Sequence, residues 1–339
     1  MTGMRFISKG RVARMKRVFV YEYLSGGGLI PSASDPTVND EAAAAELLPL
    51  GLSMRDAIAR DLLQIDAGMV SVATSSRVAS VPGNAEPVRP RAGESAFDFV
   101  ARQAALHDVA WVVAPETGGL LAQMQRVVGP ARWLGCTGPA IELASGKRAT
   151  LRQLAAHGVI TPLAFEHMPE VTRWVVKPDD GAGGVATQVH SSQENAMADW
   201  DARSHAGSPM AIEPWVDGEP LSVSLLCSAR STEMLSVNRQ RIAVGAGGAL
   251  SFEGVDVNAI AIGSDRGQAL ARVATQVAKG IAGLRGFVGI DIVWHPLRGP
   301  VVIEVNPRVT CAYVGLSASL GRNLAAELLA DHAREPAHG

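Results

Sequence analysis

Apolar residues in the first 140 positions form short continuous runs that alternate with longer stretches at helical spacing. Glycine-rich or proline-rich turns separate them, a pattern typical of an α/β lobe with a parallel sheet. Loops at the carboxyl ends of such strands, here 25–28 and 115–119, are where open α/β sheets bind ligands. We predict strands over 18–23, 70–74 and 110–114, and helices over 41–65, with a break near Gly51, and over 96–106.

A further stretch of helical spacing, over 143–156, opens the next part of the chain. Ser145 is a suitable N-cap and Gly158 a suitable stop, so Lys147 and Arg148 fall in the first turn. Cations are unfavourable at a helix N-terminus by themselves. They become favourable if a bound phosphate accepts from the helix amides and both cations together.

Lys177 stands at the end of an apolar strand, 174–178, directly before a glycine-rich turn over 179–184. Glycine amides can close over phosphate oxygens, and a lysine at the strand end can reach the same group. The spacing is not that of a P-loop. As structure alone, the segment is a β-hairpin with a return strand over 185–189, and this alternative stays open.

Proline interrupts the following strand, predicted over 210–216, and marks an edge or a hinge whose free backbone groups can bind an adenine. Another strand is predicted over 221–227. The glycines within 241–254 indicate either a mobile loop that covers a substrate or a plain flexible connection.

Two acids, Asp291 and Glu304, stand inside late apolar strands, where an ionised carboxylate is costly unless a cation meets it. Side chains alternate across a strand, so Glu304 and Asn306 share a face. Carboxylate and amide oxygens suit magnesium, which also shares its shell with nucleotide phosphates. The alternative is an ordinary buried strand whose acids pair with Arg308 or Arg285.

Composition excludes several classes of protein and partner. A chain of 339 residues is too long for one compact core, so two or three lobes are expected. A formal charge of −2 argues against nucleic-acid binding, and no apolar run reaches the ~18 residues of a membrane span. Three distant cysteines without a CxxC pair fit a reducing cytosol and offer no zinc site. We predict a cytoplasmic protein.

The chain is predicted to divide into three lobes and two tails. The basic stretch 1–16 has no apolar core, so it is a disordered tail or lies upstream of a true start at Met15. The remaining segments are an N-terminal α/β domain, a central lobe, a C-terminal lobe with the metal acids and a tail, over 17–140, 141–215, 216–330 and 331–339.

The motifs, taken in order, resemble the ATP-grasp superfamily of carboxylate–amine ligases. They are a lysine opening a helix, a Val-Lys-Pro strand with a glycine-rich loop, an acid-led hinge, and an Asp followed by Glu-x-Asn-Pro-Arg, and they span roughly residues 17–329. Their joint order is more specific than any single motif. The resemblance implies an α/β fold of the ATP-grasp type, with an N-terminal parallel-sheet (pre-ATP-grasp) lobe and two α+β lobes that grip ATP.

The same resemblance implies roles for individual residues. Lys147 and Lys177 would bind the phosphates of ATP, and Lys177 and Arg308 would be catalytic. In the D-alanine ligase branch an arginine stands two residues before the metal aspartate, where Gly289 stands here, and we predict that Arg308 takes its role. The remaining implied residues are Gly181, Gly183 and Gly184 for the lid, Glu213, Trp215 and Val216 for adenine, Glu219 for ribose, and Asp291, Glu304 and Asn306 for two magnesium ions or manganese.

A narrower resemblance is to the tyramine–glutamate ligase family of methanofuran synthesis. It rests on Pro115-Glu116, on 238–240 and on 306–316. It implies that the γ-carboxylate of glutamate is phosphorylated and that the amine of tyramine, or of tyrosine in a bacterial furan cofactor (methylofuran), attacks the acyl phosphate. The candidate substrate contacts are Glu116, Asn238, Arg239 and Tyr313.

Other classes of function stay open at this point. They are another amino-acid ligase of the D-alanine ligase type, a phosphotransferase, and a nucleotide-binding regulator without turnover. Retention of both metal acids and both lysines disfavours the regulator. We predict small-molecule partners, an amino acid and an amine, with ATP and Mg²⁺ as cofactors and with no nucleic acid or membrane partner. The sequence leaves open whether the chain is a homodimer.

Overall fold

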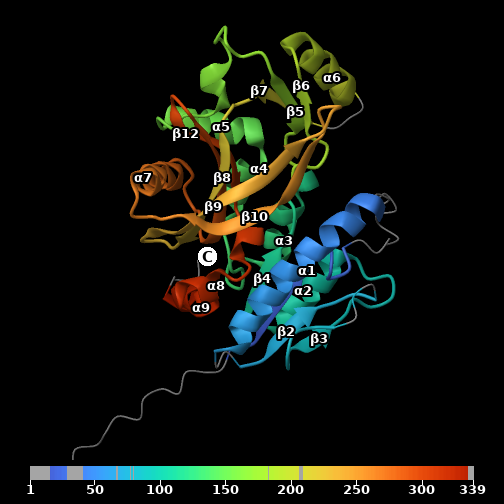
Figure 1. Cartoon of the computed structure of the whole chain (residues 1–339). Helices are drawn as coiled ribbons and strands as arrows, with labels where there is room; N and C mark the ends of the chain where they lie inside the picture. The colour runs from blue at the N-terminus through green and yellow to red at the C-terminus, as the bar shows by residue number, and fades with distance from the viewer. Residues whose placement is uncertain are drawn as a thin grey trace, which may run out of the picture.

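The computed structural model describes residues 16–28, 41–65, 68–76, 78, 80–181, 183–205 and 209–334, with the backbone alone over 41–46. The predicted start at Met15, almost all of the predicted tail 1–16, and 335–339 of the predicted C-terminal tail lie outside these residues. Among them, three sheets define three lobes (Figure 1). The first lobe lies at the bottom of that view, the second at the top and the third between them.

The first lobe is built on a four-stranded parallel sheet of order β3-β2-β1-β4, as the alternation of apolar runs and helices predicts. Every residue of β1 and β4 is buried, as expected for parallel strands covered on both faces. The elements are β1 (Val18–Glu22), α1 (Glu41–Leu63), β2 (Val70–Ala73), β3 (Glu86–Val88), α2 (Ala96–Leu106), β4 (Val109–Val113), the 3₁₀ turn η1 (Thr117–Gly119) and α3 (Leu120–Val128).

Helix α1 runs through Gly51 without interruption, so the predicted break there is wrong. A Cβ on Gly51 would lie 2.6 Å from Cδ of the buried Glu22 side chain. The glycine is therefore required by a close approach of the helix to the end of β1. It does not mark the end of a helix. Strand β3 was not predicted, because it is a three-residue edge strand inside a proline-rich connection.

Two helices, α4 (Gly138–Ser145) and α5 (Lys147–Ala156), replace the single helix predicted over 143–156. The Ser145 hydroxyl donates to the Ile141 carbonyl within α4, so the predicted N-cap is wrong. Asp179 takes that role from a distant turn, because its side chain accepts from the Arg148 amide at 3.0 Å and its carbonyl from the Lys147 amide at 2.9 Å. Lys147 and Arg148 do open a helix, as predicted.

The second lobe is a three-stranded antiparallel sheet, β6-β5-β7, covered by one helix (Figure 1). Its strand β5 carries Lys177 and has the predicted bounds. The predicted return strand is shorter than expected, because residues 184–186 form turns. The elements are η2 (Pro162–Phe165), β5 (Trp174–Pro178), β6 (Gln188–His190), α6 (Gln193–His205) and β7 (Met210–Pro214).

The third lobe is a five-stranded antiparallel sheet of order β10-β9-β8-β11-β12. One face packs on a helix, and the residues at 221, 223, 290 and 292 share a core cluster with that helix. The elements are β8 (Glu219–Cys227), β9 (Thr232–Val244), β10 (Leu250–Ile260), α7 (Asp265–Gly280), β11 (Gly286–His295) and β12 (Gly299–Asn306).

Strands β9 and β10 form a long hairpin over most of the segment predicted as a mobile loop or flexible connection, 241–254, so that prediction is wrong except at 245–249. The turn of this hairpin meets the edge of the second lobe. The Val189 amide donates to the Gly248 carbonyl at 2.8 Å, and the Leu250 amide to the Thr187 carbonyl at 3.0 Å. The hairpin therefore joins the third lobe to the second beside the glycine-rich turn.

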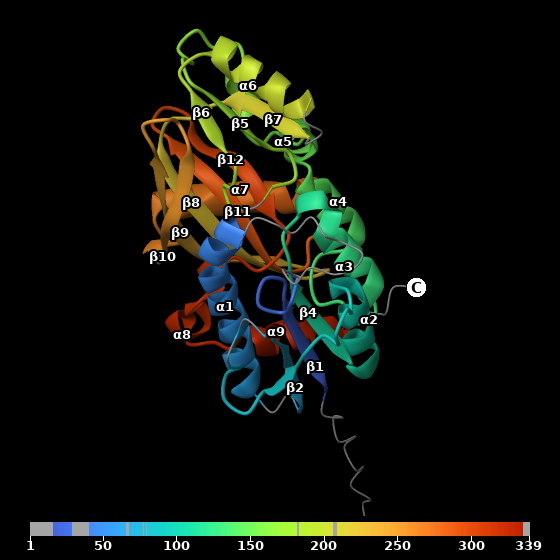
Figure 2. The ribbon, with the colours of Figure 1, turned by 90° about the vertical axis from the view of Figure 1, so that its right-hand side faces the viewer.

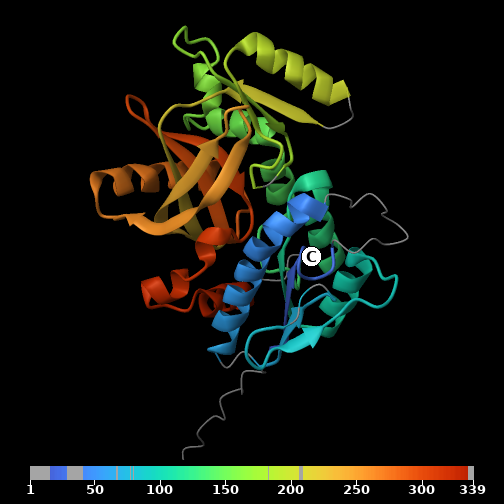
Figure 3. The same cartoon turned by 45° about the vertical axis from the view of Figure 1, so that its right-hand side comes forward.

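The end of the described chain returns to the first lobe. The 3₁₀ turn η3 (Cys311–Tyr313), α8 (Leu316–Leu320) and α9 (Leu324–Arg334) follow β12, and Figures 2 and 3 show α9 against the first lobe. Leu324 and Leu328 of α9 share a core cluster with Val18 and Ile58. No helix among the described residues has the length and apolar character to cross a membrane.

Candidate active site

The residues predicted to bind metal share one face of the third-lobe sheet. The register pairs Asp291 directly with Glu304 and with Ser222, and Gly289 with Asn306. Cross-strand neighbours lie on the same face, so Asp291, Glu304 and Asn306 come together opposite the face that packs on α7. The Asn306 amide donates from Nδ2 to Asp291 Oδ2 at 3.1 Å, which leaves its carbonyl oxygen as a ligand.

The two carboxylates form a site that fits a divalent cation. Burial and the neighbouring Glu304 carboxylate raise the pKa of Asp291 to about 6. Like charges directly across a strand pair repel each other, and a bound cation would remove that repulsion. Among the described residues no group of three or more His, Cys, Asp or Glu side chains forms a metal site. Two carboxylates and an amide would therefore leave further positions to phosphate oxygens and water, as magnesium favours.

Two lysines face this carboxylate pair. Lys147 Nζ lies 3.3 Å from Glu304 Oε1 and also donates to the Gly181 carbonyl in the glycine-rich turn. Lys177 Nζ donates to Glu213 Oε1 at 2.6 Å. Burial alone would lower the pKa of Lys177, but Glu213, followed by Glu304 and Asp291, raises it. Both lysines are thus buried beside the acids.

The glycine-rich turn lies between Lys147 and the hairpin. Gly183 and Gly184 have φ values of 68° and 71°, which favour glycine. A Cβ on Gly184 would lie 3.0 Å from Cδ2 of Leu250 in β10. The turn predicted as a lid over phosphate is therefore next to both Lys147 and the hairpin. Its residue 182 lies outside the described chain.

The hinge residues predicted for adenine follow one another at the end of β7. The Glu213 carboxylate is paired with Lys177, and the Trp215 amide donates to the Arg173 carbonyl at 2.9 Å. The Arg173 guanidinium also lies 5.1 Å from the Trp215 ring centroid. Val216 is buried in a small cluster between the second and third lobes.

Glu219 and Arg239 lie on the other face of the third-lobe sheet. Glu219 pairs with Trp294, three residues from Asp291, so the alternation of side chains places it on the α7 side. Arg239 Nε donates to Glu219 Oε1 at 2.7 Å, and Arg266 of α7 donates to the same carboxylate. The structure therefore does not bring the predicted ribose and substrate contacts, Glu219 and Arg239, together with the metal acids.

Arg308 forms a buried bidentate ion pair with Glu116 of the first lobe. Nε and Nη2 donate to the two carboxylate oxygens at 2.9 and 3.0 Å. Burial would lower the pKa of Arg308, but Glu116 and then Glu304 raise it. Arg308 hydrogen-bonds to Glu116 and not to the strand acids, and Arg285 Nη1 donates to the Leu284 carbonyl.

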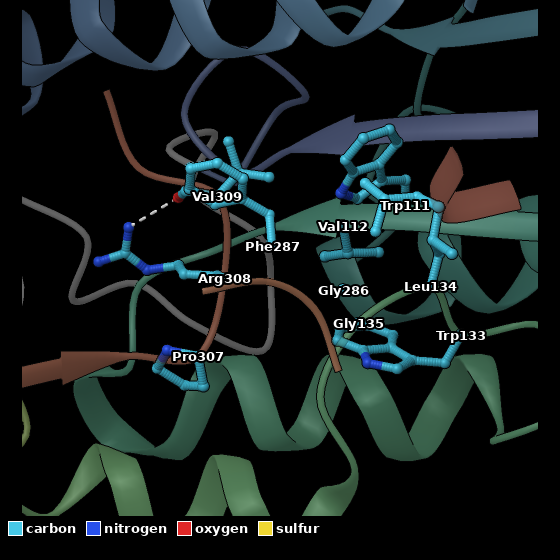
Figure 4. Close-up of a pocket in the computed structure, with 11 residues that line it drawn as sticks. Trp111, Val112, Trp133, Leu134, Gly135, Gly286, Phe287, Pro307, Arg308 and Val309 are labelled. Atoms are coloured by element: carbon cyan, nitrogen blue, oxygen red, sulfur yellow. Dashed lines mark hydrogen bonds between the residues drawn. The ribbon is translucent and has the colours of Figure 1, made fainter. Parts of the chain in front are cut away.

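At position 289 the protein has no room for the arginine of the D-alanine ligase branch. A Cβ on Gly289 would lie 2.7 Å from Thr310 Cγ2. Arg308 therefore is the arginine that lies near the acids, although it reaches the site from the strand end. Figure 4 shows it beside Pro307 and Val309, with Nη1 donating to the Val309 carbonyl at 3.2 Å.

Two other candidate substrate contacts are enclosed by the protein. Asn238 is fully buried, and its amide donates to the hydroxyls of Ser222 and Ser224 at 3.2 Å each. The Tyr313 hydroxyl donates to Asp61 Oδ2 at 2.6 Å, and its ring packs edge-on against Trp111. Both side chains lie in the packed interior.

Two cavities adjoin the Arg308–Glu116 pair. The first, between Trp111, Phe287 and Arg308, has a volume of about 10 Å³, room for one water at most (Figure 4). The second has a volume of about 380 Å³ and lies between the first lobe and the α4–α5 junction. Glu116 lines it, and Asp180, which accepts from the Gly118 amide at 2.7 Å, closes one side.

The structure shows two contacts near the candidate site that the sequence did not predict. Gln240 donates from Nε2 to Asp291 Oδ1 at 2.8 Å, and Asp179 caps the helix that begins with Lys147. Gln240 lies in the segment 238–240 of the narrower resemblance, but its contact with Asp291 depends on which strand lies beside which. Asp179 is the first residue of the glycine-rich turn, and that position does not reveal which helix it caps.

Comparisons with known proteins agree with this architecture. A family profile described as an ATP-grasp domain matches residues 144–312, and one described as a pre-ATP-grasp domain matches residues 69–141. A tyramine–L-glutamate ligase from Methanocaldococcus jannaschii is 32% identical over 214 residues, which are 62% of this chain and 59% of that protein. The match thus spans about three fifths of the curated relative.

Solved structures share the fold at low sequence identity. An ATP-grasp superfamily protein from Archaeoglobus fulgidus superposes with a TM-score of 0.65 at 21% identity, over 93% of this chain and 88% of that one. A D-alanine–D-alanine ligase from Bacillus anthracis in complex with ATP superposes with a TM-score of 0.61 at 14% identity, over 94% and 98%. The predicted arrangement of a parallel-sheet lobe followed by two α+β lobes is confirmed.

Proposed function

The chain belongs to the ATP-grasp superfamily, and from this premise we propose that it is an ATP- and magnesium-dependent ligase. It joins the γ-carboxylate of L-glutamate to the amine of tyramine or tyrosine through an acyl phosphate. The product class would serve a cofactor of the methanofuran or methylofuran type. The assignment of acid and amine is supported by the similarity to tyramine–L-glutamate ligases of two Methanocaldococcus species, at 32% and 31% identity.

One observation carries the proposal: two buried lysines converge on a carboxylate pair. Lys147 lies 3.3 Å from Glu304, and Lys177 is held by Glu213 within the electrostatic reach of Glu304 and Asp291. Phosphoryl transfer depends mainly on positioning and on cations around the moving charge. A structural ion pair would require neither a second lysine nor a second acid.

The proposed reaction has two chemical steps. A carboxylate oxygen of glutamate attacks the γ-phosphorus of ATP, the bond to the bridging oxygen breaks, and ADP leaves. The neutral amine then attacks the acyl carbon, inorganic phosphate leaves with the former carboxylate oxygen, and the amine loses a proton to solvent.

Residues of the chain bind and orient the reactants in these steps. Lys147 and Lys177 bind phosphate oxygens, and the amides of the glycine-rich turn close over them. Arg308 is held by Glu116 through Nε and Nη2, and its remaining N–H groups on Nη1 and Nη2 can donate to a carboxylate or acyl phosphate. Asp291, Glu304 and Asn306 would hold magnesium, which neutralises charge on the transferring phosphoryl group when bound.

The proposal is tested by measuring the rate of ADP release with ATP, Mg²⁺ and L-glutamate, with and without tyramine or tyrosine. The product is then identified by mass spectrometry. We expect a glutamyl amide, and ADP release that depends on both the acid and the amine. ADP release at an equal rate without any amine, with a phosphorylated product, would make the protein a phosphotransferase instead. Absence of turnover with these pairs would remove the substrate assignment.

A further inference from the structure

We propose that Gln240 is a positioning residue that fixes the Asp291 carboxylate for metal binding. The inference rests on the proposed function, because it concerns the same metal site. It adds to that site a strand, β9, that none of the predicted metal ligands occupies.

Each oxygen of the Asp291 carboxylate accepts one amide hydrogen bond. Gln240 Nε2 donates to Oδ1 at 2.8 Å, and Asn306 Nδ2 donates to Oδ2 at 3.1 Å. The two donors come from strands on opposite sides of β11 in the sheet order. The carboxylate plane is thus held from both sides, and the second lone pair of each oxygen stays available to a cation.

The reach of Gln240 follows from the register of the sheet. Strand β8 lies between β9 and β11, and its Ser222 is the direct neighbour of both Asp291 and Asn238. Two strand spacings separate β9 from β11, roughly 9–10 Å. The small side chain of Ser222, on the strand between them, leaves room on this face of the sheet. The side chains of Gln240 and Asp291 together are long enough to span the distance between β9 and β11. The Asn238 amide is itself bound to Ser222 and Ser224.

A neutral amide suits this role better than a cation would. Hydrogen bonds from Gln240 and Asn306 favour the ionised carboxylate against the opposing effects of burial and Glu304. Because a glutamine brings no charge, it does not compete with a metal ion for the acid. Partners of metal ligands of this kind commonly change metal affinity by about 10–100-fold.

Metal affinity tests the proposal without any need for turnover. Mn²⁺ binding to the full chain in the presence of ADP is measured by electron paramagnetic resonance titration for wild type, Gln240→Met and Gln268→Met. The methionine keeps the length of the side chain and removes the donor. Gln268 is a matched control, since its amide donates to the Gly263 carbonyl near the start of α7, on the other face of the sheet.

We expect Gln240→Met to weaken Mn²⁺ binding by about 10–100-fold and Gln268→Met to leave it within about twofold. Without metal, both variants should have the thermal unfolding temperature of wild type. If Gln240→Met unfolds at a lower temperature, the titration is repeated with Gln240→Asn, whose side chain is too short to reach Asp291. Wild-type Mn²⁺ affinity in a folded Gln240 variant would overturn the role of Gln240 and leave the proposed metal site standing. Absence of Mn²⁺ binding in wild type would overturn both the inference and the proposed metal site.

Discussion

Charge compensation around Glu304 and Asp291 is the central feature at the scale of single residues. Each acid has a different partner: Lys147 for Glu304, and the amides of Gln240 and Asn306 for Asp291. These partners hold the acids in place but do not remove the repulsion between the two carboxylates, which a divalent cation would remove. The proposed site is therefore one whose residues are ordered before the metal binds.

Glu304→Gln should lower the rate of ADP release at saturating ATP by about 100-fold or more, because a metal ligand and the partner of Lys147 are lost together. The isosteric amide keeps the volume of the side chain, so the variant should fold. The control is Glu253→Gln, an exposed acid of β10 in the same lobe. A Glu304→Gln enzyme with the wild-type rate would contradict the metal assignment.

The sequence alone predicts that Glu304 and Asn306 share a face, because side-chain alternation is a local rule. Glu304 and Asn306 are two residues apart in one strand, and apolar neighbours identify that strand. The side of the sheet on which Glu219 and Arg239 lie could not be predicted, because the face of a residue in another strand depends on the register between strands. The hydrogen bond between Tyr313 and Asp61 could not be predicted either, since the two residues are 252 positions apart in sequence.

At the scale of elements, the hairpin β9–β10 connects the metal face with the glycine-rich turn. Its strand β9 carries Gln240, and its turn bonds to the edge of β6. Glycine content suggested a loop in this region, yet the glycines serve the turn and a bulge opposite Arg241. The sequence also did not predict the break between α4 and α5, because the residue that caps α5, Asp179, is 31 positions away from Arg148.

Gly248→Ala should weaken the contact between the hairpin turn and β6. Its φ is +88°, and an added Cβ would lie 2.2 Å from the Val189 carbonyl oxygen. A left-handed alanine costs at least about 1 kcal/mol, so we expect KM for ATP to rise about fivefold or more. Gly247→Ala is the matched control, since nothing lies within 4 Å of its added Cβ. Equal KM values for ATP in the two variants would show that the contact of the hairpin with β6 does not affect nucleotide binding.

His107 makes the packing of α2 on the first-lobe sheet dependent on pH. Burial lowers its pKa below the usual value, so the unfolded chain binds more protons at mildly acidic pH. Its contribution to stability is therefore complete above pH ~6.5 and is lost as pH falls toward the lower folded-state pKa. His107→Gln should flatten the fall in unfolding free energy between pH 7 and 5, measured by urea denaturation.

The exposed His157 is the control for this prediction. Its ring nitrogen contacts the Gln153 carbonyl on the surface of α5, so His157→Gln should leave the pH dependence of unfolding unchanged. An equally steep loss of stability in His107→Gln would show that other groups govern the acid sensitivity.

At the scale of the whole molecule, one loop of the first lobe reaches both other lobes. Glu116 pairs with Arg308 at the end of β12, and the Gly118 amide donates to Asp180 in the glycine-rich turn. The last helix, α9, returns to pack against the first lobe. The order of the lobes could be predicted from the sequence, but these contacts join positions about 60 and 190 residues apart and need the folded structure.

Glu116→Ala should lower the free energy of unfolding by about 3 kcal/mol, because it leaves the buried Arg308 guanidinium without its partner. Adding Arg308→Ala should cost less than the sum of the single changes, since both remove one interaction. Urea denaturation of the four proteins measures the coupling. The exposed Arg126–Glu142 pair is the control, and Glu142→Ala should change stability by no more than about 1 kcal/mol. Additive effects at Glu116 and Arg308 would contradict the inter-lobe role.

In the proposed mechanism, this ATP-grasp site activates a carboxylate by phosphorylation before an amine attacks it. The most direct test is to supply L-glutamate labelled with ¹⁸O in its γ-carboxylate, together with ATP, Mg²⁺ and tyramine or tyrosine, and to analyse the released phosphate by mass spectrometry. We predict one ¹⁸O atom in inorganic phosphate for each amide formed. Unlabelled pyrophosphate alongside labelled AMP, or amide formation without any transfer of ¹⁸O, would contradict this mechanism.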